Sequence, residues 1–135
     1  RGPMQEMVRR TPEMSEAQIL EAHKKNLGIL MFANPTNIDD LSLYIQLQNT
    51  KHHRTKSRPI SATDTLTKIL SKQKTPLYVL WGEKDATVGP YLEDRMIILR
   101  KVNPDVRFHV ELNSGHWIMY ETAKRFNEIL CNILN

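Results

Sequence analysis

Residues 76–82 read PLYVLWG, and this stretch decides how the rest of the chain is interpreted. The run is apolar until it stops at a glycine, a pattern typical of a strand that is buried on both faces of a parallel sheet. Pro90 then lies at a position suited to the first turn of a helix, and Leu92, Met96 and Leu99 recur at helical spacing. We therefore predict a strand followed by a helix.

The remainder of the chain repeats this order. Residues 106–112 alternate apolar and polar side chains, as a strand with one wetter face does. Apolar residues recur at helical spacing between 123 and 134, which predicts a closing C-terminal helix. Because strand, helix, strand and helix follow one another over 76–135, we expect an α/β fold with two parallel strands joined by a right-handed crossover.

Two helices are predicted before this unit. Ser15, with a glutamine three residues later, fits a reciprocal end-cap pattern and predicts a helix over about 15–32. Asn37, with an aspartate three residues later, predicts the start of a second helix over about 38–50. Both helices carry apolar faces, and no strand lies between them, so they need another surface to pack on.

These patterns divide the chain into three parts. Residues 1–14 mix charge, proline and methionine without a clean period, and we expect them to be a flexible lead-in. Residues 15–60 form a helical segment, and residues 61–135 carry the predicted α/β unit.

The composition is that of one globular domain. Of 135 residues, 40% are hydrophobic and 25% are charged, and the formal net charge is +4. No apolar run approaches the roughly 18 residues of a membrane-spanning helix, so no membrane partner is expected. Cys131 is the single cysteine, and the chain starts at Arg1 without a charged-then-apolar leader. On these grounds we expect a cytoplasmic protein.

The basic run KHHRTKSR at 51–58 is the most strongly charged segment. It can be interpreted as an anion-binding patch, as a metal pair at His52 and His53, or simply as a solvated helix end that leads into a loop. No Cys, Asp or Glu lies close to the histidines at metal-ligand spacing, and no interleaved aromatic residues or recognition module accompany the run. We therefore expect no metal, no organic cofactor and no nucleic-acid partner.

One polar residue with chemical potential follows each predicted strand. Asp85 comes after the first strand, and His116 comes after the second. Adjacent parallel strands present such groups at the same edge of a sheet, where active sites form. An aspartate that accepts a hydrogen bond from an imidazole fixes its tautomer and favours the imidazolium formed during proton transfer. The alternatives are an ordinary turn aspartate and an ordinary surface histidine.

Two stretches within 76–130, PLYVLWGEKDATVGPYLEDR and FHVELNSGHWIMYETAKRFNEIL, resemble the C-terminal half of α/β-hydrolases. The resemblance implies a partial α/β-hydrolase fold, with a helical cap followed by strand-helix-strand-helix. It also implies that Asp85 is the acid of a catalytic triad and that His116 is its general base.

The segment 26–61 resembles the helical cap of one branch of that family, which includes the carbon–carbon bond hydrolases of aromatic meta-cleavage products. The resemblance implies that residues 15–60 act as a cap, or lid. Trp117 matches the aromatic residue that follows the histidine in this branch, and Phe32 is a second candidate. Both are expected to contribute to a substrate pocket.

The sequence departs from the family in two places. No serine has glycines two residues away on both sides, so the nucleophile elbow Gly-x-Ser-x-Gly is absent from this sequence. Near Ile45 and Gln46, where the branch has a cap arginine for the substrate carboxylate, no arginine is present, and Arg54 or Arg58 would replace it only in a rearranged cap. We therefore expect this chain to be part of a longer protein and to be inactive alone.

Two hypotheses from different classes remain open. The first is the C-terminal part of a serine hydrolase, which in its complete form hydrolyses a small ester or the activated carbon–carbon bond of a ketone. The second is a non-catalytic remnant or interaction module of the same fold. In both cases two parallel strands leave an unpaired edge, so we expect a homo-oligomer or a complex with the missing N-terminal half.

Overall fold

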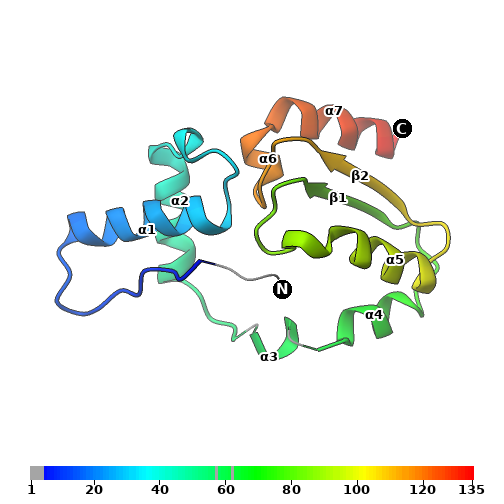
Figure 1. Ribbon diagram of the computed structural model, residues 1–135, viewed down its shortest axis with the longest axis horizontal. Helices are drawn as coiled ribbons and strands as arrows, with labels where there is room; N and C mark the ends of the chain where they lie inside the picture. Colours follow the sequence, from blue (N-terminus) through cyan, green and yellow to red (C-terminus); the bar gives the residue numbers. More distant parts are fainter. Residues whose placement is uncertain (1–4, 57, 62) are drawn as a thin grey trace.

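The computed structural model describes residues 5–56, 58–61 and 63–135. Its first part is a helical pair, and Figure 1 shows this pair set to one side of an α/β unit. The helical pair consists of α1 (Glu16–Leu30), a short 3-10 turn (Pro35–Asn37) and α2 (Asp40–Lys51). Two short helices, α3 (Arg58–Ser61) and α4 (Thr65–Leu70), connect the pair to the rest.

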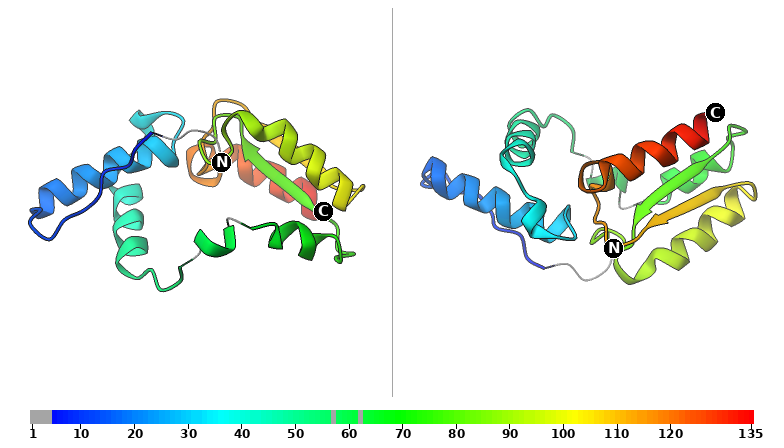
Figure 2. Two further views of the ribbon diagram at one scale, coloured as in Figure 1. Left: turned by 60° about the horizontal axis from the view of Figure 1, so that its bottom comes forward. Right: turned by 90° about the horizontal axis from the view of Figure 1, so that it is seen from above.

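The second part has the predicted order of strand, helix, strand and helix. It contains β1 (Tyr78–Gly82), a 3-10 turn (Gly89–Tyr91), α5 (Leu92–Val102), β2 (Arg107–Glu111), α6 (Ile118–Glu121) and α7 (Ala123–Leu134). The strands are parallel and in register from Tyr78 opposite Arg107 to Gly82 opposite Glu111. The views in Figures 1 and 2 show α5 and α7 on opposite faces of this two-stranded sheet. The predicted parallel crossover is therefore confirmed.

The first helix begins where the sequence predicts, and the second does not. The Ser15 side chain accepts a hydrogen bond from the N–H of Gln18, whose own side chain accepts from the N–H of Ser15. For α2 the cap is Asp39, which exchanges the same pair of bonds with Ser42. The prediction that Asn37 caps α2 is wrong, because Asn34 and the following proline fold residues 35–37 into a separate 3-10 turn.

The predicted C-terminal helix is α7, and a separate short helix, α6, precedes it with Thr122 between the two. The backbone of Thr122 has φ −129° and ψ 46°, which lies outside the helical region. The short α6 therefore runs in its own direction next to the helical pair, while α7 packs along the sheet (Figure 1).

Two glycines allow the strand ends and the helical pair to approach each other closely. A Cβ atom on Gly82 would lie 2.2 Å from the carbonyl oxygens of Ser114 and Gly115. A Cβ atom on Gly115 would lie 2.5 Å from the carbonyl oxygen of Met31, which belongs to the helical pair. Three backbone segments distant in sequence are thus stacked at one place, and side chains at these two positions would separate them.

The Gly82→Ala substitution is therefore expected to lower the free energy of unfolding by about 1–3 kcal/mol, because backbone atoms rather than flexible side chains occupy the space. Gly28→Ala is the matched control, since Gly28 lies inside α1 and its Cβ would meet only the side chains of Ile38 and Pro35, at an ordinary 3.6 Å. Alanine in a helix interior is favoured over glycine, so this control should raise stability by about 0.5–1 kcal/mol. Urea unfolding followed by circular dichroism measures both changes, and equal effects would contradict the close approach.

Candidate active site

The turn after β1 places the Asp85 side chain beside the end of β2. The Asp85 N–H donates to the Gly82 carbonyl at 3.1 Å, and its own carbonyl accepts from the N–H groups of Val88 and Gly89. Gly89 adopts φ 57°, a left-handed conformation that glycine allows at little cost. The main chain around Asp85 is thus fixed by its own hydrogen bonds, and the carboxylate is free to face the second loop.

The pair predicted from the sequence is in hydrogen-bond contact. His116 Nδ1 lies 2.8 Å from Asp85 Oδ2. The other carboxylate oxygen, Oδ1, accepts from the Thr87 N–H at 2.8 Å and from the Thr87 hydroxyl at 2.7 Å. The Asp85 side chain is 3% exposed, whereas the His116 side chain is 43% exposed. A buried, fully hydrogen-bonded carboxylate thus holds an accessible imidazole.

Two opposing effects act on the pKa of Asp85. Burial raises the pKa, but the hydrogen bonds from His116 and Thr87, together with the nearby imidazole charge, outweigh burial and leave the pKa below its ordinary value. Asp85 is therefore ionised near neutral pH and can only accept a hydrogen bond, so Nδ1 of a neutral His116 carries the proton. The lone pair of the neutral imidazole is then on Nε2, where it can accept a proton from a hydroxyl group.

A groove of about 600 Å³ lies beside this pair, between α5 and the connecting helices. His116 and Thr87 form part of its wall, and its other lining residues are Ile60, Ser61, Thr63, Asp64, Leu66, Thr67 and Arg95. Among the cavities described, this groove is the one that His116 borders. Its wall combines apolar and polar side chains.

Trp117 and Phe32 pack against each other instead of lining this groove. Their ring centroids are 5.7 Å apart, and Phe32 also contacts the Tyr120 ring edge-to-face at 5.7 Å. Phe32 is 5% exposed. The two residues join the helical pair to α6, and a role for either in substrate binding remains a prediction.

Thr87 belongs to this site but was not predicted from the sequence. Its two hydrogen bonds satisfy the oxygen of Asp85 that His116 leaves free, and its hydroxyl lies 3.3 Å from His116 Nδ1. A signal was present, because an aspartate often accepts a hydrogen bond from the N–H two residues later in a turn.

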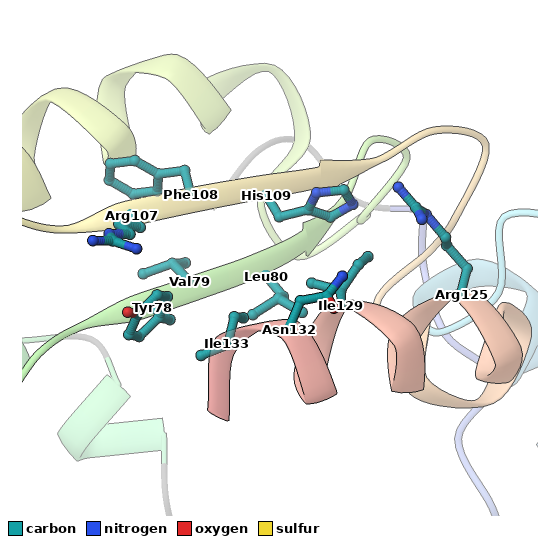
Figure 3. A pocket seen from close by; sticks show the side chains of 10 residues that line it. All are labelled: Tyr78, Val79, Leu80, Arg107, Phe108, His109, Arg125, Ile129, Asn132 and Ile133. Carbon is teal, nitrogen blue, oxygen red and sulfur yellow. The ribbon is translucent and has the colours of Figure 1, made fainter. Parts of the chain in front are cut away.

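A second cavity, of about 320 Å³, lies between the sheet and α7 (Figure 3). Two of its lining residues, His109 and Arg125, contact the carboxylate of Glu111: His109 Nε2 lies 2.8 Å and Arg125 Nε 3.7 Å from Glu111 Oε2. His109 and Glu111 both lie on β2, two residues apart, so their contact does not bring two loops together as the Asp85–His116 contact does.

Within the ranges that the structure describes, no group of three or more His, Cys, Asp or Glu side chains is arranged to hold a metal ion. In the same ranges no helix is both long enough and apolar enough to cross a bilayer.

Comparison with known proteins identifies hydrolases. A 2-hydroxy-6-oxononadienedioate/2-hydroxy-6-oxononatrienedioate hydrolase from Paraburkholderia phymatum is 35% identical over 65 residues, which are 48% of this chain and 22% of that protein. A 2-hydroxy-6-oxo-6-phenylhexa-2,4-dienoate hydrolase from Burkholderia cepacia is 28% identical over 123 residues, which are 85% of this chain and 42% of that protein. No family model matches the chain.

A crystal structure supports the same fold. It is of a protein from Burkholderia cenocepacia proposed to be an aryl esterase, and it superposes with a TM-score of 0.62 at 24% identity, covering 89% of this chain and 43% of that protein. The chain therefore has a partial α/β-hydrolase fold. In sequence it resembles the branch that contains the meta-cleavage product hydrolases, and it spans less than half the length of each of these relatives.

The Asp85→Asn substitution is expected to change how stability depends on pH. A carboxyl group whose folded pKa lies below its ordinary value of 3.8 stabilises the fold fully above that value, and this contribution is lost as pH falls through the folded pKa. The variant should therefore be less stable than the original chain by about 1.5–3 kcal/mol at pH 7, and the difference should narrow below pH 3.8. Urea unfolding at both pH values measures it, and a difference that does not depend on pH would contradict the ionised pair.

Proposed function

We propose that this chain is the acid-and-base part of a serine hydrolase, in which Asp85 orients His116 and His116 accepts the proton of a serine hydroxyl. The observation that carries the proposal is the 2.8 Å contact between a buried carboxylate and an exposed imidazole at the ends of two adjacent parallel strands. The hydrolase relatives and the shared fold support the reaction class.

The serine and the oxyanion-binding N–H groups would come from chain outside this sequence. The relatives are more than twice as long as the matched part of this chain, and no Gly-x-Ser-x-Gly occurs in these 135 residues. In that complete protein the helical segment 15–60 would act as a cap. The groove beside His116 would take a small ester or a ketone with an activated carbon–carbon bond, with Trp117 and Phe32 shaping the site from behind the histidine loop.

The alternative is a non-catalytic remnant or interaction module, and the absence of a nucleophile elbow from this sequence favours it. The two proposals differ in what precedes Arg1 in the gene. An in-frame Gly-x-Ser-x-Gly upstream supports the enzyme, and a start codon near Met4 supports the remnant.

The proposal of a partner is supported by the open sheet and the exposed apolar residues. The outer edges of β1 and β2 carry no further strand within the described residues. Large apolar side chains are exposed on several helices and in the loop after β2, among them Leu41, Tyr44, Ile60, Leu66, Ile69, Ile97, Ile98 and Leu112. We propose that the missing N-terminal half, or a second copy of this chain, covers these surfaces.

The catalytic proposal predicts the outcome of a p-nitrophenyl ester assay. The chain alone should hydrolyse the ester slowly. Its rate should exceed that of the His116→Gln variant by no more than the rate that a free imidazole gives. Together with an N-terminal half that carries the serine, the rate should rise, and His116→Gln should then lower it by about 10²–10⁴-fold. His53→Gln, a change at an exposed histidine in the basic run, is the matched control and should have no effect. A reconstituted activity that survives the loss of His116 would exclude this role.

The partner proposal makes a separate prediction, which sedimentation velocity tests. The chain alone should sediment as an oligomer, and addition of the N-terminal half should convert the oligomer to a one-to-one complex. A monomer at micromolar concentration that unfolds in one cooperative transition would count against the proposal, because a stable monomer needs no cover for its strand edges.

A further inference from the structure

The carboxylate of Glu121, at the end of α6, connects the histidine loop to the helical pair. Oε2 accepts from the N–H of Gly115 at 2.7 Å and from the N–H of Ala33 at 3.1 Å. Oε1 accepts from the N–H of Asn34 at 2.8 Å and from the side-chain amide of Asn37 at 3.3 Å. One of these donors directly precedes His116 in sequence, and the other three lie in the loop between α1 and α2.

Within the described part of the chain, Glu121 has no positively charged partner that would compete for its oxygens. Among the ion pairs of the described residues, none includes Glu121. Its charge is therefore balanced by N–H dipoles from both segments, and hydrogen bonds to an ionised acceptor are stronger than those between neutral groups. Separation of the helical pair from α6 would remove three of the four donors and leave only Gly115.

Neighbouring contacts place the same two segments against each other. The Trp117 N–H donates to the Met31 carbonyl at 2.9 Å, and the Tyr120 hydroxyl donates to Asp39 Oδ1, the carboxylate that also caps α2. Gly115 lies so close to the backbone of residues 31–33 that a Cβ would not fit. The docked helical pair therefore adds contacts from one further side that hold the histidine loop in position.

We propose that Glu121 is a positioning residue that couples the docking of the helical pair to the orientation of His116. When the pair is docked, Glu121 holds the N–H of Gly115 and so fixes the chain that presents the imidazole to Asp85. When the pair moves away, the carboxylate turns to solvent and the loop before His116 loosens. The catalytic consequence rests on the proposed function, because it requires His116 to act as a base; the structural coupling does not.

A glutamine at this position tests the coupling with almost no change in shape. Glu121→Gln keeps one acceptor oxygen but replaces the other with an NH₂ group that cannot accept. Two of the four hydrogen bonds are therefore lost, either those of Gly115 and Ala33 or those of Asn34 and Asn37. Glu128→Gln is the matched control, because Glu128 is an exposed glutamate in α7 whose described partner is Arg125 alone.

The measurement is hydrogen exchange by NMR in the 135-residue chain and its variants. In Glu121→Gln the amides of Ala33, Asn34 and Gly115 and the Nδ1 proton of His116 should all exchange about tenfold faster or more. Glu128→Gln should leave these rates unchanged. Acceleration confined to Ala33 and Asn34, with the rates of Gly115 and the His116 Nδ1 proton unaltered, would overturn the proposal, because a merely local role of Glu121 gives that result.

A second variant keeps the test decisive if Glu121→Gln does not fold. Asn37 is exposed, and Asn37→Asp places a second carboxylate beside Glu121 Oε1 with no change in size. The repulsion should speed exchange of Gly115 and of the His116 Nδ1 proton several-fold at low salt, and about 1 M salt should reverse the effect. No change at His116 in low salt would overturn the coupling.

These measurements separate the coupling from the proposed function. If the exchange rates respond as expected but the reconstituted protein hydrolyses no ester, the proposed function fails and the coupling stands. If the protein hydrolyses esters and the rates at His116 do not respond, the coupling fails and the proposed function stands.

Discussion

The parallel pairing of β1 with β2 is the constraint on which the candidate site depends. Parallel strands end at the same edge of a sheet, so the loops that follow them meet there even though 31 residues separate Asp85 from His116. In an antiparallel pair the same two loops would lie at opposite ends. Gly82 also lies very close to the carbonyls of Ser114 and Gly115, so the backbones of the two loops are in direct contact.

The parts of this arrangement that follow from local pattern were predictable from sequence. The apolar run ending at Gly82, the alternating run that follows and the Ser15 end-cap pattern each depend on residues close in sequence, and the strands, the helix start and the Asp85–His116 contact are as expected. Asp39 was missed as a cap because two neighbouring residues, Asn37 and Asp39, both fit the local pattern, and a preceding turn decides between them.

The parts that depend on contacts between distant segments were not predictable. The hydrogen bond from the Asn34 N–H to Glu121 joins residues 87 positions apart, and nothing near either residue indicates it. The same holds for Phe32, whose buried position against Trp117 arises only when the helical pair docks on α6. Sequence patterns thus predicted the Asp85–His116 pair, whereas the contacts of Glu121 and Phe32 that surround it became visible only in the structure.

The central physical claim is that an ionised Asp85 holds a neutral His116 with its proton on Nδ1 and its lone pair on Nε2. The ¹⁵N chemical shifts of the neutral His116 ring test this directly, because protonated and unprotonated ring nitrogens have well-separated shifts. The account predicts a protonated Nδ1 and an unprotonated Nε2. A proton found on Nε2 would contradict it, since the imidazole would then be unable to accept a proton from a hydroxyl group at that atom.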